Sequence, residues 1–288
     1  MEQKHILGTP GERQKADPNL NAELIKKYSH KPPIRDDSLT EPPTQPPTEP
    51  QQIITTADIT KSDYIQIPGV VGLYGGSVLI SKFEMPGAND KNYEDAHRFV
   101  LREGLYIPPP AIFAPHFVNV VTTYRNKTPL FDGDSNPIPR KEHEDIYRHL
   151  TTNHIAVYGV KGREGAWAWL NARLIQGTGF KNLNLETVLS LNPDDTLKTR
   201  IALLQDHIKG EGIYVDLDFN NQGAPTKKSA TQSYQQGINL RFWGPRINAV
   251  ARFFASSGRA GLGFFGGPEY SGSSLGVFPC AEGATQKF

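Results

Sequence analysis

The stretch that decides the fold runs from Arg241 to Gly283 and reads RFWGPRINAVARFFASSGRAGLGFFGGPEYSGSSLGVFPCAEG. Between Gly244 and Cys280 it contains no Lys, Gln, Met, Trp, His, Thr or Asp, and Glu269 is its one glutamate. The rest of the chain uses Lys and Thr freely. A composition this restricted, dominated by Gly, Ser, Ala, Phe and Arg, indicates a segment under a special constraint.

Two kinds of position interleave in this segment. One kind could build a buried sheet face: Phe242, Trp243, Val250, Ala251, Phe253, Leu262, Leu275 and Val277. The other kind follows no hydrophobic rule: Gly244, Ile247, Asn248, Ala249, Phe254, Ser256, Gly258, Arg259, Gly261, Gly263, Phe265, Gly266, Gly267 and Gly272. Because successive side chains on a strand face opposite sides, we expect Phe253 in the core and Phe254 on an exposed face.

The segment resembles the variable region of the variable proteins of diversity-generating retroelements, of the archaeal or archaeal-virus type. The resemblance rests on the frame W-x-P-R-x-x-x-V-A-R-F-x-A-x-S-x-x-A-x-L, followed by P-x-x-S-x-S-x-L-G-V-F-x-C-A-E-G. In that family a reverse transcriptase rewrites adenine-containing codons, so that AAY becomes NNY. NNY codons exclude Lys, Glu, Gln, Met and Trp, and all fourteen positions of the second kind carry residues that NNY allows.

The resemblance implies a C-type lectin fold of the formylglycine-generating-enzyme-like subclass and a variable region over about 241–283. It also implies a non-enzymatic display protein, whose fourteen variable positions bind a protein or glycan on a cell or particle surface. Exposed Phe254, Arg259 and Phe265 would be the aromatic and guanidinium anchors of such an interface. A fixed-specificity, calcium-dependent sugar-binding lectin is the alternative, and an enzyme of the formylglycine-generating kind is a third one, which the single Cys280 disfavours.

The chain before this segment favours an α+β fold with an antiparallel sheet, flanking helices and insertions. Asn92 and Asp95 suit a helix N-terminus, and Gly104 ends the helix that they predict. A second helical segment is expected over 111–121, and strands over 77–83, 154–160 and 213–219. The stretches 166–175 and 197–207 fit either a strand or a helix, and 126–145 is expected to be an exposed, turn-rich insertion.

Residues 1–52 differ from the rest, since they hold nine of the 23 prolines. We expect a flexible, proline-rich arm there, which either attaches the chain to a larger assembly or is a free terminus, and a lectin-like domain over 53–288. No apolar run follows the charged N-terminal residues, so no secretory signal is expected, and localisation on a virus particle or a cell surface stays open. No apolar stretch suggests membrane insertion.

Composition and motifs give no sign of catalysis, cofactor or metal. Lys and Arg number 31 against 30 acidic residues, which argues against nucleic acid. The G-x-G-x-x-G match at 261–266 precedes no helix, and the G-x-S-x-G match at 272–276 has no histidine after it. His143 and His149 are expected on a solvated helix face. Asp132, Asp134 and Asn136 offer oxygen ligands for calcium but lack a later glutamate.

Overall fold

The computed structural model describes residues 59–152, 165–177, 182–256 and 258–282. The arm expected over 1–52 and the strand expected over 154–160 lie outside the described residues. The described part is a mixed α+β structure that is mostly sheet, as the sequence predicts.

Seven strands form the larger sheet, in the spatial order β5-β4-β3-β8-β9-β7-β6. Neighbouring strands are antiparallel except β7 and β9, which run parallel. In chain order the strands are β3 (Trp167–Gln176), β4 (Leu183–Leu191), β5 (Leu197–Leu203), β6 (Glu211–Asp216), β7 (Asn239–Trp243), β8 (Val250–Ser256) and β9 (Arg259–Gly266). The C-terminal segment therefore supplies three of the central strands.

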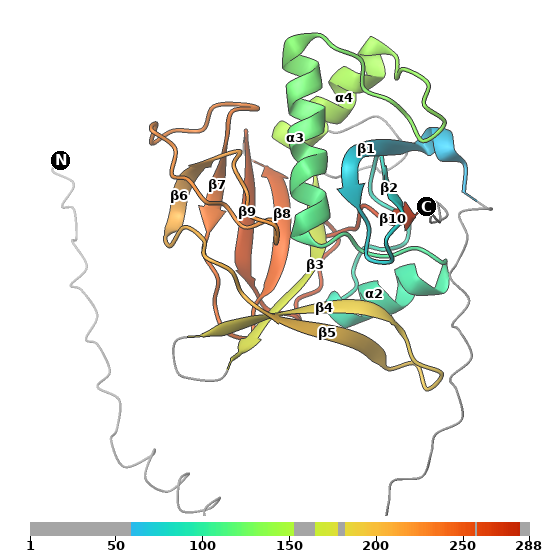
Figure 1. The fold of residues 1–288 in the computed structure, drawn as a ribbon, viewed down its shortest axis with the longest axis vertical. Helices are drawn as coiled ribbons and strands as arrows, with labels where there is room; N and C mark the ends of the chain where they lie inside the picture. Colours follow the sequence, from blue (N-terminus) through green and yellow to red (C-terminus); the bar gives the residue numbers. More distant parts are fainter. Residues whose placement is uncertain (1–58, 153–164, 178–181, 257, 283–288) are drawn as a thin grey trace, which may run out of the picture. The chain divides into compact units, whose positions relative to one another are not determined.

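A smaller sheet and the helices complete the domain. The smaller sheet has the order β1-β2-β10, with β1 (Tyr64–Val71), β2 (Ser77–Ser81) and β10 (Cys280–Glu282). The helices are α2 (Tyr93–Arg102), α3 (Pro110–Asn126) and α4 (Arg140–Thr151), and a 3-10 turn, η2, spans Lys61–Asp63. In Figure 1, α3 lies between the two sheets, alongside β8, and it contacts both β1 and β3.

Helix α2 begins where the sequence predicts. The Asn92 side chain accepts a hydrogen bond of 2.9 Å from the backbone N–H of Asp95, which satisfies one of the free donors at the helix start. Ala96 and Val100 are buried on one face of the helix. The predicted strands over 77–83 and 213–219 are also present, as β2 and β6.

The exposed, turn-rich insertion expected over 126–145 is confirmed over most of 127–139, where exposed residues predominate, and is wrong for the rest. Leu130 and Ile138 are buried in the main core, and α4 starts at Arg140. His143 and His149 were expected in solvent and are instead 2% and 4% exposed. Each ring nitrogen Nε2 has a buried partner: the Val120 carbonyl oxygen at 3.2 Å for His143, and Glu84 Oε2 at 2.7 Å for His149. The polar composition around Arg140 therefore concealed the start of α4, a helix that packs into the core.

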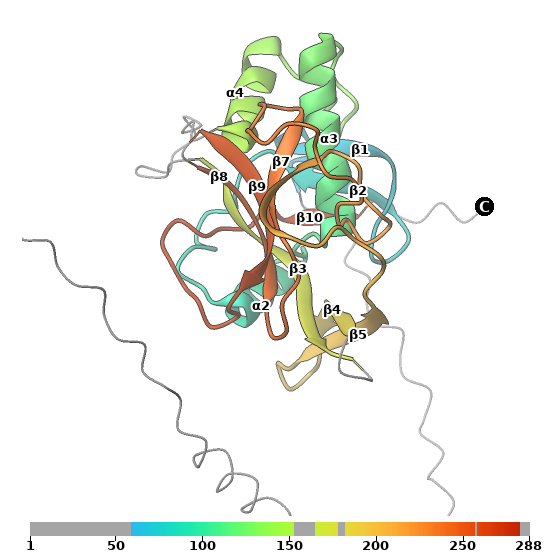
Figure 2. The same cartoon turned by 90° about the vertical axis from the view of Figure 1, so that its left-hand side faces the viewer.

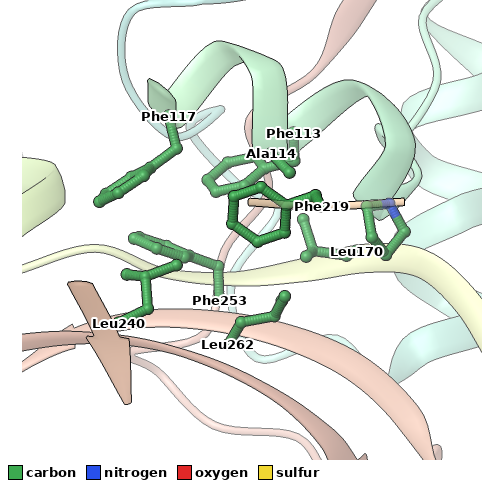
Figure 3. A pocket seen from close by; sticks show the side chains of 9 residues that line it. Phe113, Ala114, Phe117, Leu170, Phe219, Leu240, Phe253 and Leu262 are labelled. Atoms are coloured by element: carbon green, nitrogen blue, oxygen red, sulfur yellow. The ribbon is translucent and has the colours of Figure 1, made fainter. Parts of the chain in front are cut away.

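The main core lies between α3 and one face of the large sheet (Figure 3). The ring of Phe253 on β8 packs against Phe113 at 4.7 Å and Phe117 at 5.5 Å, both on α3. Leu240 and Leu262 extend this layer onto β7 and β9. The gap left between these side chains is about 10 Å³, which is at most the size of one water, so this face is packed core and not a ligand pocket.

Two buried histidines give the fold a testable dependence on pH. Burial lowers the pKa of His97 and of His116 to about 3, from an ordinary 6.5. Between these values the unfolded chain binds more protons than the folded chain, so stability is lost as pH falls from about 6.5 towards 3. We expect the free energy of unfolding in urea to fall by up to about 1.4 kcal/mol per pH unit for each histidine.

Urea titrations at pH 7, 6 and 5 would measure this loss. His97→Gln should flatten the dependence, whereas His207→Gln, a change in the half-buried stretch after β5, should leave it in place. A free energy of unfolding that stays constant from pH 7 to pH 5 would contradict the expectation.

Candidate ligand-binding face

The side of the large sheet that faces away from α3 is called here the outer face, and two rows of side chains cross it. Strand pairing sets each row, because residues paired in register on neighbouring strands point the same way. The first row contains Trp167, Phe254, Gly261 and Arg241, on β3, β8, β9 and β7. The second row contains Trp169, Arg252, Gly263 and Trp243 on the same four strands. Figure 2 shows β7, β8 and β9 side by side.

Phe254 lies on the outer face, but it is not exposed. Its neighbour Phe253 is in the main core, so the alternation expected from the sequence is confirmed. Yet only 6% of Phe254 is exposed, since its ring lies 5.3 Å from both Trp167 and Trp243. The prediction of an exposed Phe254 is therefore wrong, because two tryptophans on neighbouring strands cover the ring.

Trp243 was expected in the core and lies instead on the outer face, half buried. Its ring is 5.5 Å from that of Phe265, and the guanidinium of Arg241 lies 4.7 Å above it. The other residues expected in the core are all buried, namely Phe242, Val250, Ala251, Phe253, Leu262, Leu275 and Val277. An outer aromatic layer, made by Trp167, Trp243, Phe254 and Phe265, thus mirrors the inner core.

Glycines on β9 make room for this layer. A Cβ atom at Gly261 would overlap the ring of Phe254, and one at Gly263 would overlap the ring of Phe265. A Cβ atom at Gly266 would likewise overlap the guanidinium of Arg252. The large side chains therefore lie flat over backbone, and the glycines beneath them are buried although they belong to the outer face.

The fourteen variable-type positions divide by exposure into three groups. Exposed positions are Ile247, Asn248, Gly258, Phe265 and Gly267. Half-buried positions are Ser256, Arg259 and Gly272. Buried positions are Gly244, Ala249, Phe254, Gly261, Gly263 and Gly266, so the expectation that all fourteen point into solvent is wrong for these. The structure brings most of the fourteen to the outer face and to the turns at its ends.

Arg252 is the most enclosed cation of the outer face. It is 9% exposed, and its guanidinium lies between the rings of Trp169, at 4.3 Å, and Tyr270, at 4.6 Å. Its Nη2 donates to the Gly267 carbonyl oxygen at 2.8 Å. Burial lowers the pKa of Arg252 to about 10, which leaves it charged at neutral pH. Arg252 therefore holds the loop after β9 against the sheet.

Asn248 lies in the turn between β7 and β8 with a left-handed backbone, at φ 59°. Its N–H donates to the Leu174 carbonyl oxygen at 2.7 Å, which ties the turn to β3. Asn adopts this conformation more readily than most residues, whereas β-branched residues are strained in it. Substitution at this exposed position is limited by backbone conformation and not by packing.

The other patterns singled out in the sequence form no site in the described residues. Asp132 uses its Oδ1 to accept bonds from the N–H groups of Asp134 and Asn136, at 2.9 and 2.8 Å, which closes its own turn. Across the described ranges no group of His, Cys, Asp and Glu is placed to hold a metal ion. The glycine motif at 261–266 is strand β9, and Cys280 is buried in β10. An open hollow of about 610 Å³ has Leu183, Glu211 and Gly244 among its lining, which mixes polar and apolar residues.

Comparison with protein-family models, curated proteins and solved structures gives no match to this chain. Among the described residues no helix has the length and apolarity needed to cross a bilayer. The case for function therefore depends on the geometry of the outer face and on the sequence frame.

The contact between Phe254 and Gly261 predicts energetic coupling between these two positions. Gly261→Ala alone should lower the free energy of unfolding by about 1–3 kcal/mol, since the new methyl group displaces a covered ring. In a Phe254→Ala background the same change should be nearly neutral, because the ring is gone. A double-mutant cycle by chemical denaturation should give a coupling energy of roughly 1 kcal/mol or more. Additive effects would show that the ring does not lie over Gly261 in solution.

Proposed function

We propose that this chain is a non-enzymatic ligand-display protein of the retroelement variable-protein type, with a C-type lectin fold of the formylglycine-generating-enzyme-like subclass. Its outer face and adjoining turns bind a protein or glycan on a cell or particle surface. The proposal is supported by the sequence frame, which supplies much of the buried sheet, and by the placement of variable-type residues between its members.

The observation that carries the proposal is the two-sidedness of β8. Ala251, Phe253 and Ala255 face the main core, and Arg252, Phe254 and Ser256 face outward. A surface that changes its sequence must be separated from the core, because burial of one large apolar side chain is worth about 1.5–3 kcal/mol in a protein whose total stability is about 5–15 kcal/mol. On β8 that separation falls between adjacent residues.

The calcium-dependent sugar-binding alternative has less support. It depends on Asp132, Asp134 and Asn136, and the Asp132 carboxylate is already engaged by two backbone N–H groups of its own loop.

The proposed arm over 1–52, as an attachment to a larger assembly, extends the display function to the part of the chain outside the described residues.

Substitutions should separate the two faces. Ile247→Ser, at an exposed variable-type position, should change the free energy of unfolding by less than about 1 kcal/mol. Phe265→Ser, which also removes the ring contact with Trp243, should lower it by about 0.5–1.5 kcal/mol. Phe253→Ala and Leu262→Ala should each lower it by about 2–5 kcal/mol, since they open cavities in the core.

Chemical denaturation of these four variants, with matched circular dichroism spectra, is the measurement. Losses of several kcal/mol at both Ile247 and Phe265 would make these positions structural and would remove the support for a variable face.

Calcium raises the melting temperature only if it binds the folded state. Since the display proposal includes no calcium site, we expect the melting temperature to stay the same when calcium or EDTA is added. Differential scanning calorimetry would test this, with calcium at several times the dissociation constant of weak extracellular calcium sites, which is about 1 mM. Asp132→Asn serves as the variant, and a calcium-dependent rise that this variant abolishes would favour the sugar-binding alternative.

A further inference from the structure

Three arginines on the outer face are left without an acidic partner. The side chains of Arg241, Arg252 and Arg259 form no ion pair within the described residues, and the Nε atom of each is buried without a hydrogen-bond partner there. Buried donors of this kind are costly unless something satisfies them. The outer face therefore combines local positive charge with unsatisfied donors, although the whole chain carries a net charge of only +1.

These arginines also share one side of the sheet. Arg241 pairs in register with Gly261 on β9, and Arg259 lies two residues before Gly261, so both side chains leave the same face on adjacent strands. The guanidinium of Arg241 lies over Gly212, where an added Cβ atom would come within 3.2 Å of its Nη2. Like charges on one face of adjacent strands repel each other, and a bound anion offsets that repulsion.

A nearby arginine shows the contrast. Arg246, in the turn before β8, is paired with Glu211 at 2.7 Å. Glu269 is the acidic residue of the loop after β9, and it makes no ion pair with the three arginines in the described structure. Charge compensation is thus supplied at the rim and is missing on the face itself.

We propose that the outer face binds acidic segments of a partner protein, with Arg241 as a constant carboxylate anchor beside the variable-type Arg259. The inference rests on the proposed display function and specifies its ligand class. Arg241 and Arg252 lie outside the fourteen variable-type positions, so diversification would change the shape of the site and keep its preference for anions. Guanidinium groups bind carboxylates through paired hydrogen bonds, and they gain strength where water is excluded.

A protein partner fits this face better than a small ligand does. Small-molecule sites are concave, whereas this surface is the side of a sheet whose floor is formed by flat aromatic rings and glycine backbone. Tyr270 and Phe265 are 52% and 39% exposed beside the arginines. Aromatic residues together with arginine are the composition that dominates protein–protein binding energy.

Tryptophan fluorescence offers a direct test, because all three tryptophans of the chain, Trp167, Trp169 and Trp243, belong to the outer face. The full chain would be titrated with end-blocked hexaglutamate, with hexaglutamine as the uncharged probe and with a galacturonate hexamer as the acidic-sugar probe. We expect a saturable change with hexaglutamate that weakens as salt is added, and none with hexaglutamine.

Three variants assign the binding to the arginines. Arg241→Gln should weaken hexaglutamate binding by roughly tenfold, as loss of a charged hydrogen bond does, and Arg241→Gln/Arg259→Gln should abolish it. Arg241→Lys should recover part of the affinity, because it keeps the charge. Arg246→Gln is the matched control and should bind like the unchanged chain, since that arginine already has a partner.

Equal losses in Arg246→Gln and Arg241→Gln, or equal binding of hexaglutamine, would overturn the proposal. Binding of the galacturonate hexamer without hexaglutamate would replace the protein ligand by an acidic glycan and would also overturn it. Failure here, with exposed variable-type positions still tolerant of substitution, removes only the acidic-ligand inference. Loss of that tolerance is the separate result that removes the display function.

Discussion

The structure depends on the packing of Phe253 against α3. This ring meets Phe113 and Phe117 at the centre of the main core, and it fixes which side of β8 faces α3. A shift of one residue in strand register would turn every side chain of β8 over, so this contact sets the register of the strands that follow. Because β8 lies between β3 and β9, the contact also determines which residues of β3, β9 and β7 share the outer face.

The outer face has its own layer of packing, and this makes it less independent of the fold than a plain surface. Phe254 is covered by Trp167 and Trp243, and Trp243 also contacts Phe265. Trp167 lies on β3, outside the C-terminal segment, so the layer joins that segment to the rest of the sheet. Its rings lie over glycines and stabilise the face without extending the inner core.

Local rules predicted much of the fold. The cap at Asn92, the alternation around β6 and the two faces of β8 each follow from residues close in sequence, and each is present. The misses arise where distant residues decide the outcome. His149 is buried because Glu84 lies opposite it, and Phe254 is covered because strand pairing brings tryptophans from β3 and β7 beside it. No pattern within either segment indicates those partners.

If the outer face is the variable surface that we propose, the contacts of its aromatic rings with the glycines of β9 limit which side chains it can carry. A side chain larger than Gly at 261 needs the space that the Phe254 ring now fills, and positions 263 and 265 are linked in the same way. Variation at these four positions is therefore variation in two pairs, in which one member can be large while the other stays small. Ile247, Gly258 and Gly267 lie in turns or on the rim and carry no such restriction from packing, although Gly258 has a left-handed backbone at φ 73°. The centre of the face would then change by exchanging which position of each pair carries the ring, and its edge would change one residue at a time.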